Sequence, residues 1–144
     1  MLRQSSKLIK SVASKNLRIT SLQTRFYASA TSEHVISIKD DDHFIKHLKE
    51  TTKPFIIDVY ADWCGPCKML GPILQNVVTE HNGKIELVTI NSDNLPDLAG
   101  ELGVEALPTL FFVQPGGKFV YRHVGFADKS NIQSLVKKHL LEGQ

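Results

Sequence analysis

Cys64 and Cys67 are the only cysteines of the chain, and two residues separate them. At this spacing one helical turn brings the two sulfur atoms within reach of a disulfide bond. The residues before the pair, 54–60, are mostly apolar and β-branched and predict a buried strand, while those after it predict a long helix. A cysteine at the start of a helix lies at the positive end of the helix dipole, where the thiolate is favoured. The pair is therefore predicted to carry out thiol–disulfide exchange.

Charge divides the chain into two parts. Residues 1–30, the basic leader, carry six Lys or Arg and no acid, so the other 114 of the 144 residues hold 17 − 6 = 11 basic and 15 acidic side chains. A domain with a net charge of 11 − 15 = −4 gives no reason to expect a nucleic-acid partner. No apolar stretch is long enough for a secretory signal or a membrane span.

The leader has the composition of an organellar transit peptide, because it combines Arg, Lys and Ser with scattered apolar residues and no acid. Arg25, Phe26 and Tyr27 resemble a mitochondrial processing site. We expect residues 1–27 to be a mitochondrial transit peptide cleaved after Tyr27, residues 28–144 to be the mature domain, and the matrix to be its location. The alternatives are a basic tail that is never removed and, less favoured because the basic residues recur at helical spacing, chloroplast import.

The mature part is long enough to bury one core without disulfides, and a pair so close in sequence closes too small a loop to stabilise a fold. Hydrophobic periodicity and turn residues predict the element order βαβαβα–ββα, with a helix kinked at Pro72 and capping residues Asp40 and Asp128. This order predicts a central mixed sheet with helices on both faces. The long helix is predicted to turn six apolar side chains inward: Met69, Leu70, Ile73, Leu74, Val77 and Val78.

Three segments and one glycine resemble the thioredoxin family. The active-site motif is matched by Ala61-Asp62-Trp63-Cys64-Gly65-Pro66-Cys67-Lys68, the strand before it by Phe55 to Asp58, the cis-proline loop by Ala106-Leu107-Pro108-Thr109, and a glycine after the last strand by Gly125. The resemblance covers about residues 35–141 and implies an α/β thioredoxin fold. Together with the leader, it points to the mitochondrial members of the family.

The resemblance implies that Cys64 is an exposed attacking thiol and that Cys67 resolves the mixed disulfide. Gly65 and Pro66 have no side chain that could donate a hydrogen bond to sulfur, so thiolate stabilisation is moderate and the pair is expected to act as a reductant. The alternative for Cys64 is a buried, inert cysteine.

Asp58 is an acid in an apolar strand, and burial without a partner should raise the pKa of its carboxyl. The family assigns this position to proton transfer with the resolving cysteine. Many thioredoxins carry a Lys nearby, where this chain has Thr89. The alternative is an exposed acid on the other face of the sheet.

Trp63, Leu107, Pro108 and Gly125 are expected, from the resemblance, to form the surface that receives an extended substrate peptide. The Leu107–Pro108 bond is expected to be cis. For Trp63 the alternative is ordinary packing.

The resemblance also implies a monomer without a bound cofactor. Electrons would come from NADPH indirectly, through a thioredoxin reductase, because the chain lacks a GxGxxG fingerprint; peroxiredoxins are expected substrates. His43 and His47 have metal-capable spacing, but we expect no metal site. The alternative function is a binding or scaffold module that does not turn over.

Overall fold

One five-stranded sheet organises the part of the chain that the computed structural model describes, residues 33–142. The predicted transit peptide and its cleavage site lie outside the described residues. The spatial order of the strands is β1-β3-β2-β4-β5. Their bounds are β1 Val35–Ser37, β2 Phe55–Tyr60, β3 Glu86–Asn91, β4 Thr109–Gln114 and β5 Lys118–Val124. β3 runs parallel to both β1 and β2, whereas β4 is antiparallel to β2 and β5, so the predicted mixed sheet is confirmed.

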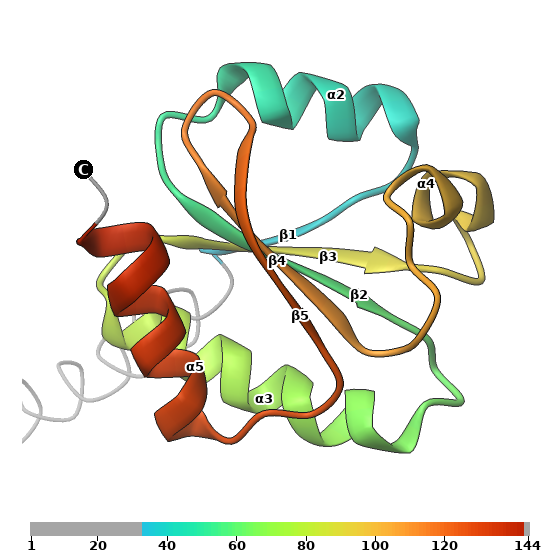
Figure 1. Cartoon of the computed structure of the whole chain (residues 1–144). Helices are drawn as coiled ribbons and strands as arrows, with labels where there is room; N and C mark the ends of the chain where they lie inside the picture. Colours follow the sequence, from blue (N-terminus) through green and yellow to red (C-terminus); the bar gives the residue numbers. More distant parts are fainter. Residues whose placement is uncertain (1–32, 143–144) are drawn as a thin grey trace, which may run out of the picture. The chain divides into compact units, whose positions relative to one another are not determined.

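Helices cover both faces of the sheet. They are α2 Asp41–Glu50, α3 Gly65–Glu80, α4 Pro96–Glu101, α5 Lys129–Val136 and a π-helical turn, η1 Lys137–Leu141. Figure 1 shows α2 and α4 on one face and α3 and α5 on the other, which agrees with two separate clusters of buried side chains on the two faces. The predicted element order and layering are thus confirmed.

The side chains of β2 point alternately to the two faces of the sheet, and this decides which helices each of them contacts. Ile56 packs in the cluster with α3 and α5, while Phe55, Ile57 and Val59 pack in the cluster with α2 and α4. Successive side chains of a strand point to opposite faces, so Asp58 shares the α3 face with Ile56. This strand therefore brings a carboxyl group to the helix that carries the cysteines.

Local signals in the sequence account for the ends of the helices. Asp40 accepts a hydrogen bond from the His43 amide at 2.7 Å, and Asp128 accepts one from the Asn131 amide at 2.8 Å, as N-caps do. After α3, Asn82 has a φ of 50°, a left-handed conformation that asparagine tolerates. α3 itself continues through Pro72 as one helix.

One prediction about the helices is wrong. Met69 does not face the core: 59% of it is exposed, because the buried positions of α3 follow the spacing of Cys67, Leu70 and Leu74, one residue away from it. The last helix is α-helical as far as Val136. It changes into η1, whose wider turn is closed by a hydrogen bond from the Glu142 amide to the Lys137 carbonyl.

Candidate active site

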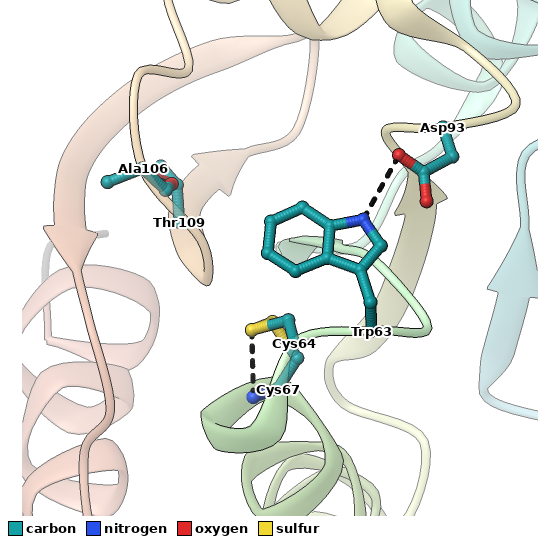
Figure 2. The surroundings of a disulfide bond; sticks show 6 residues. All are labelled: Trp63, Cys64, Cys67, Asp93, Ala106 and Thr109. Carbon is teal, nitrogen blue, oxygen red and sulfur yellow. Dashed lines mark hydrogen bonds between the residues drawn. A yellow bond between two sulfur atoms is a disulfide. The ribbon is translucent and has the colours of Figure 1, made fainter.

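Cys64 and Cys67 form a disulfide at the first turn of α3, with 5.3 Å between their Cα atoms. Cys64 is the N-cap of this 16-residue helix, and its sulfur accepts a hydrogen bond from the Cys67 amide at 3.2 Å (Figure 2). Pro66 has no amide hydrogen, so the Cys67 amide is the donor that the first turn directs at the sulfur. The helix start therefore surrounds Cys64 with positive potential.

The expectation that Cys64 is exposed is wrong in this disulfide form. Only 4% of Cys64 and 5% of Cys67 are accessible to solvent. The pair forms a small apolar cluster with Ala61, and the partly buried Tyr60 and Leu107 pack against it. An incoming substrate must therefore reach the sulfur across the rim of this cluster.

Trp63 is the exposed part of that rim, with 71% of its surface accessible. Its indole Nε1 donates a hydrogen bond to Oδ1 of Asp93 at 3.3 Å, which fixes the ring beside the loop of Ala106 (Figure 2). The sequence reasoning did not identify Asp93. In the sequence, Asp93 is only an acidic residue shortly after the third predicted strand. Its hydrogen-bond partner, Trp63, lies 30 residues away. The alternative that Trp63 is an ordinary core residue does not hold.

The Leu107–Pro108 peptide bond is cis, as expected. Two hydrogen bonds hold the loop: the Thr109 hydroxyl donates to the Ala106 carbonyl at 2.7 Å, and the Gly125 amide donates to the Pro108 carbonyl at 2.8 Å. Gly125 has a φ of 96°, which disfavours any side chain. Leu107 is half-buried and Pro108 is buried, so Pro108 supports the loop from within. Through its hydrogen bond to Pro108, Gly125 connects the end of β5 to the cis-proline loop.

Asp58 is buried, with 4% of its surface accessible, so the alternative of an exposed strand acid is excluded. Within residues 33–142 its Oδ1 has no hydrogen-bond partner. Burial raises the pKa of its carboxyl to about 7.

A pocket of about 430 Å³ connects Asp58 with the Cys67 side of the disulfide, because Asp58, Cys67 and Thr89 all line it. Thr89 is the register partner of Asp58 on β3. The expected juxtaposition of these two residues is therefore confirmed. The pocket is open near Lys68 and Gln75, two exposed residues of α3.

His43 and His47 do not converge on one point. The Lys39 amide donates to Nδ1 of His43 at 3.3 Å, while Nε2 of His47 lies 3.5 Å from Oε2 of Glu86. In the part of the chain that the structure describes, no group of three or more His, Cys, Asp or Glu side chains could hold a metal ion. None of the helices described is long and apolar enough to cross a membrane.

Residues 35–138 match the thioredoxin family. A thioredoxin of Chlorobaculum thiosulfatiphilum is 33% identical over 100 residues, covering 69% of this chain and 92% of that protein. A mitochondrial thioredoxin of Bos taurus is 33% identical over 123 residues, covering 85% of this chain and 74% of that protein. A crystal structure of a thioredoxin from Nicotiana alata superimposes with a TM-score of 0.66 at 34% identity, covering 74% of this chain and 93% of that one.

Proposed function

Because the chain belongs to the thioredoxin family, whose members are protein-disulfide oxidoreductases, we propose that it reduces disulfides of mitochondrial proteins with Cys64 and Cys67. The observation that carries the proposal is the disulfide at the N-terminus of α3, where the sulfur of Cys64 accepts the Cys67 amide. The redox group is the pair itself, which exchanges two electrons and two protons.

Cys64 is the attacking thiol in this proposal. In the reduced protein its thiolate attacks one sulfur of the substrate disulfide, the substrate S–S bond breaks, and the leaving sulfur takes up a proton. The positive end of α3 favours the thiolate over the thiol. Gly65 and Pro66 tune the pair by keeping other hydrogen-bond donors away from the sulfurs.

Cys67 then resolves the mixed disulfide. It gives up its proton, attacks the sulfur of Cys64 and releases the second substrate sulfur, which leaves the Cys64–Cys67 disulfide seen in the structure. Asp58 lines the same pocket as Cys67, and a carboxyl with a pKa of about 7 can accept and return a proton near neutral pH. Asp58 is therefore assigned as the proton acceptor for Cys67.

The substrate is proposed to lie across Trp63, Leu107, Pro108 and Gly125. The indole of Trp63 offers exposed apolar surface beside the disulfide, and Leu107 packs against the disulfide cluster. Pro108 and Gly125 act through the backbone, because the hydrogen bond between them fixes the loop along which an extended peptide would run.

Re-reduction is assigned to a thioredoxin reductase fed by NADPH, and peroxiredoxins are the proposed substrates. Mitochondrial location, with residues 1–27 as a transit peptide and 28–144 as the thioredoxin domain, is supported by the basic leader and by the similarity to mitochondrial thioredoxins of Bos taurus and Rattus norvegicus. The matrix is the compartment that such a leader addresses.

Reduction of insulin disulfides by the purified chain, with dithiothreitol as the electron source, tests the proposal. The wild type should accelerate insulin precipitation, whereas Cys64→Ser should give the rate of dithiothreitol alone. A wild type that binds disulfide proteins yet leaves that rate unchanged would instead indicate the scaffold function.

A further inference from the structure

The pocket that Asp58 lines, here called the Asp58 pocket, has space for more than a proton path. Its volume of about 430 Å³ is that of a small-molecule site. Apolar side chains of Val35, Ala61 and Pro72 line part of it. Gly71 of α3 lines it too, and an added Cβ there would meet no atom within 4 Å. The pocket can therefore hold the apolar body of a small organic molecule.

Asp58 is the buried polar residue of this pocket. Only 4% of its surface is accessible, and within residues 33–142 its Oδ1 has no hydrogen-bond partner. Its register partner Thr89 carries a hydroxyl group but no charge. In the part of the chain that the structure describes, no salt bridge pairs the carboxylate with a cation. A ligand that brings both a positive charge and an N–H donor therefore supplies what this carboxylate lacks when it is ionised.

The other ionisable side chains that line the pocket do not give it a strong charge of their own. Asp62 and Lys68 are exposed and opposite in charge, so their charges largely offset each other. Asp62 also accepts a hydrogen bond from Asn91 at 3.4 Å. Tyr60 and Cys67 are the remaining ionisable residues of the lining, and Cys67 is held in the disulfide. The buried carboxylate therefore decides which charge the pocket prefers.

We propose that the Asp58 pocket binds a small organic cation, with an amidinium or guanidinium group against Asp58 and a short apolar body against Val35 and Pro72. A planar cation with several N–H donors can pair with a carboxylate through two hydrogen bonds at once. This site goes beyond the proposed function, because a ligand can bind the disulfide form without any disulfide exchange.

Binding of such a cation should strengthen as pH rises, because the ligand pairs with the ionised carboxyl. With a pKa of about 7, the ionised fraction of Asp58 falls from about 0.9 at pH 8 to about 0.1 at pH 6. The affinity should therefore fall about tenfold over this range, since only the ionised form is competent to bind. The bound cation should in turn lower the pKa of Asp58.

Butylguanidinium and the neutral butylurea, which has nearly the same shape, test the site on the oxidised full chain. NMR titration of the backbone amides should give a Kd of about 1 mM for butylguanidinium at pH 8. Its binding should be about tenfold weaker at pH 6, and butylurea should bind at least about tenfold more weakly at pH 8. The shifted amides should include those of Gly71, Gln75 and Thr89, which line the pocket.

Variants separate the charge of the pocket from its space. Asp58→Asn keeps the shape of the side chain without its charge, so butylguanidinium should bind this variant no more tightly than butylurea. Gly71→Leu should weaken the binding of both probes, because its side chain would fill the pocket. Asn76→Leu is the matched control: it adds the same side chain to an exposed position of α3 outside the pocket lining, and both Kd values should persist. Asp62→Asn should change the Kd of butylguanidinium by no more than about twofold.

Three results would overturn the site. They are equal Kd values for the two probes at pH 8, no saturable binding of butylguanidinium up to about 20 mM, and a preference for the cation that survives Asp58→Asn but is lost in Asp62→Asn. Each of them would leave the proposed function standing, because that function is measured separately by the reduction of insulin without either probe.

Discussion

Asp58 is the one charged residue buried in the core of residues 33–142. The sequence already set it apart, since a carboxyl group in an apolar strand must find a partner or hold a proton. Its lack of a partner at Oδ1 and its pKa of about 7 agree with the second choice. Asp58 is costly to bury and yet lies beside Cys67. Substitutions of Asp58 therefore test how the site works.

Asp58→Asn should stabilise the domain, and more so at high pH. The pKa of Asp58 is raised from 3.8 to about 7 on folding. Between these values only the unfolded state ionises, so the stability of the wild type falls as pH rises and levels off above the folded pKa. The gain from Asp58→Asn should be about 2–3 kcal/mol larger at pH 8 than at pH 5, measured by urea unfolding of the oxidised protein.

The same variant should reduce insulin more slowly, by at least roughly tenfold at neutral pH, because the acceptor for the Cys67 proton is lost. A stability gain that does not change with pH would show that Asp58 ionises as readily in the folded state as in the unfolded chain. An unchanged insulin rate would remove Asp58 from the mechanism.

Thr89→Lys should lower the pKa of Asp58. The two residues are register partners that line one pocket, so an ammonium group at position 89 would favour the nearby carboxylate. The pKa should fall from about 7 to about 5–6, followed by NMR titration of the carboxyl carbon. Thr89→Met fills the pocket without charge and should leave the titration near that of the wild type. Equal titrations for both variants would mean that the lysine turns away from Asp58.

Cys67→Ser should accumulate substrates as mixed disulfides on Cys64, because attack by Cys64 remains and resolution is lost. Affinity capture from mitochondrial extract and non-reducing gels should show adducts that dithiothreitol removes. Cys64→Ser and the double variant should show none. Adducts on Cys64→Ser but not on Cys67→Ser would reverse the roles of the two thiols.

At the scale of the elements, the sequence predicted what local patterns determine. The capping residues Asp40 and Asp128, the strand around Asp58 and the helix after Cys64 all follow from hydrophobic period and capping chemistry. Met69 was placed wrongly because a short apolar run on a helix has no unique phase until the core fixes one.

Local sequence patterns do not predict contacts between segments that are far apart in the chain. The burial of Cys64 depends on Leu107, 43 positions further along the chain, and the Trp63–Asp93 hydrogen bond joins two loops. For the cis-proline loop and Gly125, resemblance to a family supplied what local physics could not, since a cis bond is uncommon even before proline.

Gly125→Ala should destabilise the domain through its backbone. At a φ of 96° an alanine is strained, although no atom lies within 4 Å of the position its Cβ would take. We expect a loss of about 1–2 kcal/mol in the free energy of unfolding. Gly100→Ala is the matched control: it too has open space, but its backbone in α4 suits alanine, so it should stabilise by about 0.5–1 kcal/mol. Equal effects would show that the conformation of Gly125 costs alanine nothing.

At the scale of the whole molecule, the proposed function assigns import to the leader and the redox chemistry to the rest of the chain. All the residues assigned to exchange, proton transfer and substrate contact lie between Asp58 and Gly125, in the acidic part of the chain. The six basic residues of the leader contribute none of them. Since no assigned site residue lies in the leader, the two parts can be tested independently.

Residues 1–27 fused to a fluorescent reporter should carry it into mitochondria, because a basic, acid-free segment with scattered apolar residues is what import machinery and the membrane potential act on. Replacing the leader's basic residues by Gln, at Arg3, Lys7, Lys10, Lys15, Arg18 and Arg25, keeps its length and apolar residues and should leave the reporter in the cytosol. Deleting residues 1–27 from the chain itself should relocate it without changing its insulin-reduction rate, because no assigned site residue is removed. Cytosolic fluorescence of the unaltered fusion would refute the mitochondrial assignment, and chloroplast fluorescence in plant cells would favour the other organelle.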